Sequence, residues 1–408
     1  MNVKRKIMIL GASILQLPAI LKAKEMGLHV IAIDMDKNAV GFKHSDVCEC
    51  ISTIDIPRVM EVAKKHCIDG VMTLASDMPM LTVATISEEM KLVGITKEIA
   101  IKATNKAVMR EVLKEHNVPI PLFFRVSSKS DYLNIIKKFK RSCVVKPVDN
   151  SGSRGVYLIE NIEDKSIVEN AFKHSKKYSR SGEIIVEEYM RGKEVSVETL
   201  SVDGNVHVIA ITDKITTGAP YFVEMGHSQP TNHNNEMKNR IMEVSVMAVK
   251  AMGIENGPSH TEIIVTEEGP KIVELGARLG GDNITTHLTP LSTGVDMVKC
   301  CINIALGEEP DFEQKFNKGS AIRYADTQAG IVRSIEGIEE ANNIEGIQEI
   351  IFTKYIGDKI NIINSSIERI GFVIAQSVTA EKAVDSCEKA LNRININLEN
   401  PSDGYHDN

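Results

Sequence analysis

The sequence predicts an α/β protein that begins with a doubly wound parallel sheet. Short apolar runs at residues 6–12, 29–34 and 71–74 are expected to be buried strands, and residues 16–27, between the first two, have the pattern of a helix. Strands that alternate with helices are typical of parallel sheets with helices on both faces. We therefore expect such a sheet in the N-terminal part of the chain.

The chain of 408 residues is too long for one domain, because single cores stop growing near roughly 250–300 residues. We place an N-terminal α/β domain at residues 1–102, a central domain at residues 103–308 and a C-terminal α+β domain at residues 309–408. The central domain is expected to include a mobile lobe at about residues 121–190. Short strands such as residues 371–375, followed by a helical pattern, indicate the mixed class of the C-terminal domain.

A strand, a glycine, a helix and a second strand that ends in Asp34 also fit a dinucleotide-binding domain, in which the acid contacts a ribose. That kind of domain approaches the pyrophosphate through the three glycines of GxGxxG. The turn here runs from Gly11 to Gln16 and has only the first of these glycines. An NAD-dependent oxidoreductase is therefore not expected.

Two glutamates, Glu262 and Glu274, are expected to face each other across a β-hairpin. Residues 261–265 and 271–275 alternate in polarity around a turn at residues 266–270. This register makes the glutamates cross-strand partners on one face, where like charges destabilise a hairpin unless a cation lies between them. Paired carboxylates suit Mg²⁺, which often binds together with substrate phosphates. A solvated acidic hairpin is the alternative.

A glycine- and serine-rich loop separates two further strands, at residues 143–147 and 156–159. The loop, residues 149–155, has glycines that let backbone N–H groups approach an anion, serine hydroxyl groups, and two nearby cations, Lys146 and Arg154. It can fold over phosphate groups, although such a loop is more often a simple turn. It is not a Walker A loop, since the GxxxxGK[ST] pattern is absent and a strand follows.

A helix is expected at residues 107–114, with Thr104 as its N-cap. Lys106 then lies in the first helical turn, where the macrodipole disfavours a cation. Its side chain is therefore expected either to point to solvent or to bind an anion.

Composition indicates a cytoplasmic enzyme. The formal net charge is −7 without a basic cluster, so neither nucleic acid nor an anionic membrane is an expected partner. No apolar stretch is long enough to span a bilayer, and the basic start lacks the pattern of a secretory signal. The seven cysteines lack the spacing of a zinc site, so we expect reduced thiols.

Five motifs, in this order, resemble the ATP-grasp superfamily and, within it, carboxylate–amine ligases such as the bacterial L-amino acid ligases. The motifs are Asn105-Lys106 before a helix followed by VPIP, VVKPVDNSGSRGV, VEEYMRGKEVSVE, HTEI and VELGARLGGD. The likeness spans nearly the whole chain. It implies an ATP-grasp fold in which the parallel-sheet domain comes first and a small β-rich domain comes last.

The resemblance implies a nucleotide site, because several residues match ATP-binding positions of the family. In those proteins two lysines contact the phosphates, a flap folds over them, a hinge reads adenine and an acid holds the ribose. The matching residues, in the same order, are Lys106 and Lys146, then Ser151, Gly152, Ser153 and Gly155, then Glu187 with the backbone of Glu188, Tyr189 and Met190, and finally Glu194.

The resemblance also implies that Glu262 and Glu274 bind Mg²⁺ or Mn²⁺ and that Arg278 steadies the transferred phosphoryl group. Many family members have Asn where this chain has Gly276, so a second metal would be held differently here. His260, beside Glu262, either supports that carboxylate or is simply packed.

An irregular segment is expected at residues 216–230, and loops of this kind often carry substrate contacts. His227 lies there in GHSQP, which is similar to the GHxxP element of amino acid ligases. Its ring can orient a substrate or take a proton from an amine, since its ordinary pKa is near neutrality; a surface histidine is the alternative. Lys214 either meets a phosphate or only solvent. Arg278 to Asp282 offers a cation and an acid to a zwitterion.

We predict an ATP-dependent, ADP-forming ligase that joins a carboxylate, expected to be that of an amino acid, to an amine through an acyl phosphate. Its partners would be small-molecule carboxylate and amine substrates with ATP and Mg²⁺, and a homodimer is expected. One alternative is a purine-biosynthesis-type ligase or carboxylase, similar to phosphoribosylglycinamide synthetase, with the same ATP site. Another is a nucleotide-binding regulator without catalysis, for which Gly276 is the support.

Overall fold

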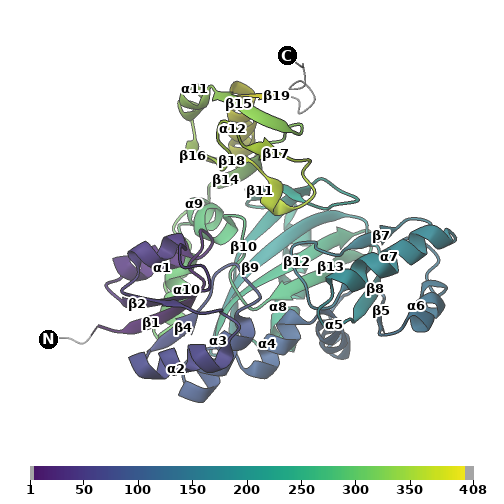
Figure 1. Ribbon diagram of the computed structural model, residues 1–408, viewed down its shortest axis with the longest axis horizontal. Helices are drawn as coiled ribbons and strands as arrows, with labels where there is room; N and C mark the ends of the chain where they lie inside the picture. Colours follow the sequence, from purple (N-terminus) through teal and green to yellow (C-terminus); the bar gives the residue numbers. More distant parts are fainter. Residues whose placement is uncertain (1–3, 400–408) are drawn as a thin grey trace, which may run out of the picture.

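The computed structural model describes residues 4–399. These residues form four sheets, of which the largest is an eight-stranded antiparallel sheet in the middle of the molecule. A parallel sheet near the N-terminus, a small lobe and the C-terminal part lie on different sides of this central sheet (Figure 1). None of the helices within residues 4–399 has the length and apolar character of a membrane span.

The N-terminal sheet is parallel, as the sequence predicts, with the strand order β3-β2-β1-β4. Its strands are β1 (Lys6–Leu10), β2 (His29–Asp34), β3 (Val47–Cys50) and β4 (Gly70–Met72). The helices of this part are α1 (Leu17–Glu25), α2 (Ile56–His66), α3 (Met80–Met90) and α4 (Lys97–Thr104). Asp34 accepts a hydrogen bond from the backbone N–H of Ala12 at 2.8 Å, so its carboxylate holds together the loop that follows β1.

The lobe has a four-stranded sheet of its own, in the order β5-β8-β6-β7. Its strands are β5 (Phe123–Val126), β6 (Cys143–Pro147), β7 (Tyr157–Ile159) and β8 (Ile184–Glu188). Helices α6 (Lys129–Ile136) and α7 (Lys165–Tyr178) pack on it. Tyr132 and Phe172, with ring centroids 5.0 Å apart, connect the two helices in the core of the lobe.

The central sheet has the strand order β13-β12-β9-β10-β11-β14-β18-β16. Its strands are β9 (Lys193–Val202), β10 (Asn205–Thr216), β11 (Glu224–Gln229), β12 (Gly257–Thr266), β13 (Gly269–Gly276), β14 (Gly319–Tyr324), β16 (Ile347–Phe352) and β18 (Gly371–Ser377). The accompanying helices are α5 (Lys106–Glu115), α8 (Asn235–Met252), α9 (Thr289–Thr293) and α10 (Met297–Ala305). The last three strands in this order come from the predicted C-terminal domain, so the sheet continues across the boundary placed at residue 308.

Strand β11 corrects the prediction of an irregular segment over residues 216–230. Residues 224–229 pair with β10 on one side and with β14 on the other, and the loop is confined to residues 217–223. The segment EMGHSQ has no alternation of apolar and polar residues, because both faces of this strand are covered and four of its six residues are buried polar side chains or glycine. Pattern alone therefore could not identify it.

The remainder of the C-terminal part is a three-stranded sheet in the order β17-β15-β19. Its strands are β15 (Gly330–Glu336), β17 (Lys359–Ile360) and β19 (Asn395–Glu399), and the helices are α11 (Ile338–Asn342) and α12 (Ala380–Arg393). Helix α12 packs on β14 and β18 through Ala383 and Cys387.

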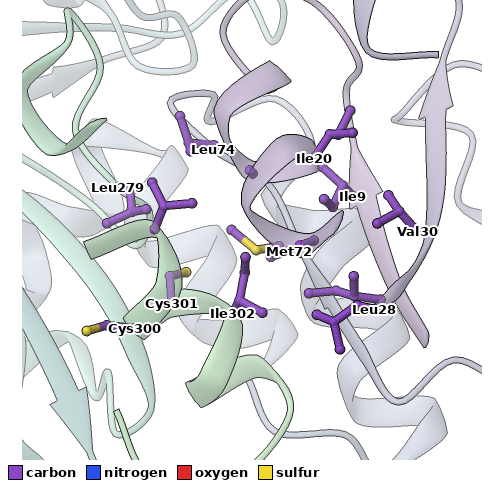
Figure 2. Packing of buried hydrophobic residues seen from close by; sticks show 14 of the residues in the cluster. Ile9, Ile20, Leu28, Val30, Met72, Leu74, Leu279, Cys300, Cys301 and Ile302 are labelled. Atoms are coloured by element: carbon purple, nitrogen blue, oxygen red, sulfur yellow. The ribbon is translucent and has the colours of Figure 1, made fainter. Parts of the chain in front are cut away.

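Alternate side chains of β1 enter two different cores, as expected for a strand covered on both faces. Ile9 packs in a cluster with Ile20 of α1 and Ile302 of α10 (Figure 2). Leu10, the next residue, packs in another cluster with Val59 of α2. Because α10 belongs to the central part of the chain, the first core fixes the N-terminal sheet against it.

Candidate active site

The hairpin of β12 and β13 carries the two predicted glutamates opposite each other. Glu262 and Glu274 are cross-strand partners, which confirms the predicted register. The tight turn pairs Thr266 with Gly269, and a bulge between Glu262 and Ile263 then restores the partnership. Both carboxylates are about one quarter exposed, at 24% and 26%, and face a common cleft.

Two lysines compensate the charge of the facing glutamates. Lys214 Nζ lies 3.0 Å from Glu262 Oε1, and Lys106 Nζ lies 2.9 Å from Glu274 Oε1. Burial disfavours the charged form of Glu262, but the attraction of Lys214 and of neighbouring His260 holds the pKa of this glutamate well below its usual range. Positive charge beside the facing glutamates is therefore supplied by the chain itself, and Lys214 does not point to solvent.

Lys106 begins helix α5 and is nearly buried. The N-cap is Asn105, whose side chain accepts from the N–H groups of Ala107 and Val108, so the prediction of Thr104 was wrong. Thr104 is the last residue of α4, and its hydroxyl donates within that helix. Lys106 Nζ donates to the backbone carbonyl of Asn150 at 2.7 Å in addition to Glu274. Its charge thus has an anionic partner, which was one of the two predicted possibilities.

Lys146 and Glu187 form a buried cluster with Arg110, a residue that the sequence analysis did not select. Lys146 Nζ lies 2.6 Å from Glu187 Oε2, and Arg110 Nε donates to Glu187 Oε1 at 2.7 Å. Burial opposes ionisation of this carboxyl, but Arg110 and Lys146 outweigh it and lower the pKa of Glu187 to about 2. The Glu187 carboxylate is thus engaged by two cations.

The predicted flap is a loop with an unusual backbone. Gly152, Ser153 and Gly155 have φ angles of 63°, 55° and 85°, in the left-handed region that glycine favours. The Arg154 guanidinium donates to the carbonyl of Ser151 at 3.0 Å within the loop. A Cβ at Gly155 would lie 2.6 Å from the Cβ of Tyr178, so only glycine fits there without a shift.

Arg278 is held by Asp77, a residue of the N-terminal part. The guanidinium donates twice to the carboxylate, from Nε at 2.8 Å and from Nη2 at 3.2 Å. Burial works against the charge of Arg278, but Asp77 overcomes it and raises the pKa of the guanidinium. A Cβ at Gly276 would lie 3.1 Å from Asp77 Oδ1, so the glycine makes room for this pair. The sequence analysis missed Asp77, which lies in the loop after β4. An acidic residue next to Ser76 was the only feature of the sequence that could have indicated a role for it.

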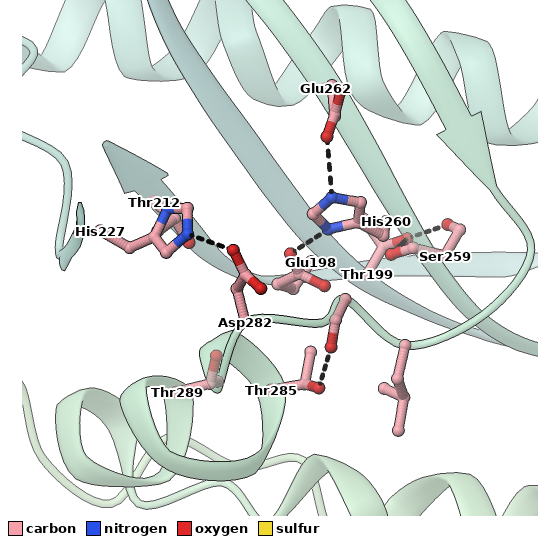
Figure 3. Close-up of polar contacts among 12 residues, drawn as sticks. Glu198, Thr199, Thr212, His227, Ser259, His260, Glu262, Asp282, Thr285 and Thr289 are labelled. Atoms are coloured by element: carbon pink, nitrogen blue, oxygen red, sulfur yellow. Dashed lines mark hydrogen bonds and ion pairs between the residues drawn. The ribbon is translucent and has the colours of Figure 1, made fainter. Parts of the chain in front are cut away.

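His227, on β11, faces Asp282, and Asp282 in turn is held by Arg369 of the C-terminal part. His227 Nε2 lies 3.4 Å from Asp282 Oδ2, and the Arg369 guanidinium donates to both oxygens of Asp282 at 2.7 Å (Figure 3 shows the first contact). Burial alone would raise the pKa of Asp282, but Arg369 and His227 hold it well below its usual range. His227 is buried rather than a surface residue, and its Nδ1 has no partner within residues 4–399.

Glu262 has a further neighbour in His260, two residues before it on the same face of β12. His260 Nδ1 lies 2.5 Å from Oε1 of the buried Glu198, and its Nε2 lies 3.5 Å from Glu262 Oε1 (Figure 3). Burial lowers the tendency of the ring to protonate, but the attraction of Glu198 prevails and raises the pKa of His260 to about 9.

These groups converge on one cleft of about 490 Å³. All the predicted site residues line it except Gly155, the last residue of the flap, which packs against Tyr178. The cleft lining also includes residues from outside the five motifs: Ser76, Asp77, Lys214, Glu224 and Ser366. Glu194 is among the lining residues, and its carboxylate lies 2.6 Å from Lys214 Nζ. The arrangement can neutralise a polyanion and can bind a hard cation through carboxylates.

Two parts of the chain match models of known protein families. Residues 139–286 match the family model described as the ATP-grasp domain, and residues 323–399 match L-amino acid ligase C-terminal domain 2. An L-arginine-specific L-amino acid ligase from Bacillus subtilis is 23% identical over 313 residues, which cover 76% of this chain and 75% of that protein.

Solved structures have the same fold over almost the whole chain. An L-amino acid ligase from Bacillus licheniformis has a TM-score of 0.85 at 23% sequence identity, and the match covers 98% of this chain and 100% of that one. A phosphoribosylglycinamide synthetase from Anaerococcus prevotii has a TM-score of 0.79 at 24% identity, with 97% and 100% covered.

The chain therefore contains a domain of the ATP-grasp class, at residues 139–286. Its C-terminal domain and its relatives narrow this class: it is a carboxylate–amine ligase, an enzyme that forms C–N bonds, and it resembles the bacterial L-amino acid ligases.

Proposed function

We propose that the chain is an ADP-forming ligase that activates the carboxylate of an amino acid as an acyl phosphate and transfers the acyl group to an amine. The observation that carries this proposal is the convergence of three buried or nearly buried cations, Lys106, Lys146 and Arg278, with the facing carboxylates Glu262 and Glu274 in one cleft. Phosphoryl transfer needs mainly such positioning and charge neutralisation.

ATP would bind between the lobe and the central sheet. We assign the phosphates to Lys106 and Lys146, the covering flap to Ser151, Gly152, Ser153 and Gly155, the adenine hinge to the backbone of residues 188–190, and the ribose to Glu194. Support comes from the cleft, which these residues line from both sides apart from Gly155. The lysines now paired with glutamates would exchange those partners for phosphate oxygens.

Glu262 and Glu274 would hold Mg²⁺ or Mn²⁺. In each carboxylate Oε1 contacts a lysine, while Oε2 makes no hydrogen bond within residues 4–399, and an oxygen pair of this kind fits a hard divalent cation. When bound, the ion would neutralise charge on the phosphate groups. Gly276 offers no side-chain ligand, so Glu262 and Glu274 are the side chains we assign to the metal.

In the first step, an oxygen of the substrate carboxylate attacks the γ-phosphorus, the bond to the bridging oxygen breaks, and ADP leaves. Lys146 and Lys106 would stabilise the charge that moves onto ADP, and Arg278 the charge on the transferred group. Asp77 supports this role because its bidentate pair fixes the guanidinium plane. The flap would exclude water, which otherwise hydrolyses the acyl phosphate.

In the second step, the amine nitrogen attacks the acyl carbon, the bond from that carbon to the phosphate oxygen breaks, and inorganic phosphate leaves with an oxygen of the original carboxylate. The nitrogen must lose a proton, and we assign its acceptance or the orientation of the amine to His227. The unpartnered Nδ1 and the support from Asp282 favour this residue.

The test is ADP release from Mg²⁺-ATP across a panel of amino acids, singly and in pairs. We expect ADP and phosphate to form only with an accepted amino acid, and carboxylate ¹⁸O to appear in the phosphate. Formation of AMP and pyrophosphate would refute the acyl-phosphate mechanism. A chain that binds ATP but turns over no substrate would favour the regulator instead.

A purine-type ligase is the second candidate, because the match to phosphoribosylglycinamide synthetase is nearly as good as that to the amino acid ligase. The same panel decides between them when 5-phosphoribosylamine with glycine is included. The match to the L-amino acid ligase C-terminal domain favours an amino acid as the substrate whose carboxylate is activated. The expected homodimer stays a prediction that sedimentation can check.

A further inference from the structure

A buried acid–imidazole pair lies under the hairpin that carries Glu262. Glu198 on β9 is completely buried, and His260 on β12 is its direct cross-strand neighbour. His260 Nδ1 is 2.5 Å from Glu198 Oε1, whereas Oε2 of this glutamate has no partner within residues 4–399. The pair is therefore a buried acid–imidazole contact in which one acceptor atom, Glu198 Oε2, has no hydrogen bond within residues 4–399.

Stability alone does not account for this pair. A buried ion pair is often no better than apolar residues of similar size, and an unpaired buried oxygen adds a cost. The surrounding chain is nevertheless fitted to it: a Cβ at Gly280 would lie 2.7 Å from His260 Nδ1 and 2.8 Å from Glu198 Oε2. The loop that follows Arg278 packs directly on the pair because residue 280 is a glycine. We therefore look for a role of the pair in the contact that the other ring nitrogen of His260, Nε2, makes.

The other end of His260 contacts Glu262. Nε2 lies 3.5 Å from Glu262 Oε1, the same oxygen that Lys214 approaches to 3.0 Å. Lys214 and His260 thus approach Oε1 from different strands, β10 and β12, and a rotation of the carboxylate would move Oε1 away from both. Oε2 is left as the oxygen without a hydrogen bond in the described part of the chain. Among residues 4–399, Glu274 has only Lys106 as an ion-pair partner.

We propose that Glu198 and His260 are positioning residues: Glu198 fixes the imidazole, and the imidazole fixes Glu262 with Oε2 presented to the divalent cation. The inference rests on the proposed function of Glu262 as a metal ligand. Partners of this kind orient ligating side chains, and their loss commonly weakens metal binding by about 10- to 100-fold.

The experiment measures Mn²⁺ affinity by electron paramagnetic resonance of free Mn²⁺, with ADP present, for the complete chain and for His260→Gln and Glu198→Gln. Ser259→Ala is the matched control, because the hydroxyls of Ser259 and Thr199 contact each other across the same two strands without touching Glu262. ADP affinity in EDTA and circular dichroism are measured for every variant. We expect both test variants to bind Mn²⁺ about 10- to 100-fold more weakly, with metal-free ADP affinity unchanged and the control like the parent.

The possible failures are distinguishable. If the parent chain binds neither ADP nor Mn²⁺, the proposed function itself is wrong and the inference falls with it. If the parent binds both, but the folded variants bind Mn²⁺ within twofold of it, only the positioning role is wrong. Should His260→Gln not fold, Glu198→Gln decides, since glutamine keeps the volume and an acceptor for Nδ1–H. If neither folds, the pair is structural and the proposal is overturned.

Discussion

Replacing Glu187 by glutamine should destabilise the contact between the lobe and the central part, although the shape of the side chain at residue 187 is almost unchanged. The carboxylate lies between the Arg110 guanidinium and the Lys146 ammonium, and the three side chains are 5%, 1% and 8% exposed, respectively. Arg110 also donates to the backbone carbonyl of Val273 at 2.7 Å, so it cannot move out to water freely. The substitution therefore leaves two buried cations without a counter-charge.

Two lines of reasoning give a similar magnitude. Removing one partner of a buried ion pair commonly costs about 3–5 kcal/mol. Independently, the pKa of Glu187 is about 2, against an ordinary value of 4.5. Since each pKa unit corresponds to about 1.36 kcal/mol, this difference represents about 3 kcal/mol of stabilisation at neutral pH. We expect Glu187→Gln to lower the local stability by about that amount.

Hydrogen exchange of the β6 and β8 backbone amides at pH 7 measures the effect, because a loss of about 3 kcal/mol makes exchange through local opening more than about 100-fold faster. Glu188→Gln is the control: its neighbouring carboxylate is 45% exposed and contacts Lys271 at 3.8 Å, so its loss should cost less than about 1 kcal/mol. Equal exchange in the Glu187 and Glu188 variants would refute the reasoning.

The pH dependence provides a second check on the same residue. Because the folded-state pKa of Glu187 is depressed, its stabilisation is present above about pH 4.5 and is lost as the pH falls toward 2. The difference in stability between the parent chain and Glu187→Gln should therefore shrink over this interval. A difference that stays constant down to pH 2 would show that folding does not lower the pKa of Glu187.

Three further predictions follow from the cleft. Glu274→Gln should abolish Mg²⁺-dependent ADP release and leave Lys106 without its carboxylate partner; full turnover by this variant, or by the parent chain in EDTA, would contradict the metal site. Amides of residues 151–155 should exchange more slowly with saturating Mg²⁺-ATP than without it, and equal rates would show that this loop is not the flap. Asp77→Asn should lower kcat by about 10-fold or more because the Arg278 guanidinium loses its bidentate partner, with little change in KM for ATP; Ser76→Ala is the control, and an unchanged kcat would exclude a positioning role.

The hairpin illustrates how much of the site could be predicted from the sequence. The alternation of β12 and β13 around a central turn identified both strands and the facing of Glu262 with Glu274, because a period of two leaves few registers. The bulge beside Glu262 could not be predicted, since its cause is the local backbone and not the pattern. The predicted register was correct because the bulge offset a tighter turn than the one expected.

The unpredicted parts of the site are contacts between distant segments. Arg110 lies 77 residues from Glu187, in a helix whose pattern says nothing about a buried cation, and Asp77 lies 201 residues from Arg278. Arg369 reaches Asp282 from a short turn in the C-terminal part. Motifs predict the side chains that are candidates for binding a ligand. The residues that hold those side chains in place cannot be predicted in this way, because their proximity depends on the tertiary fold.

The continuity of the central sheet has a practical consequence for protein engineering. β14 hydrogen-bonds to β11, the strand that bears His227, so a chain cut at residue 308 would leave β11 as an open edge, a template for aggregation. A graft intended to transfer specificity from a homologue should therefore keep β11 and β14 from the same parent. Its crossover point belongs before residue 224 or beyond residue 324, because the β11–β14 pair then comes from one parent.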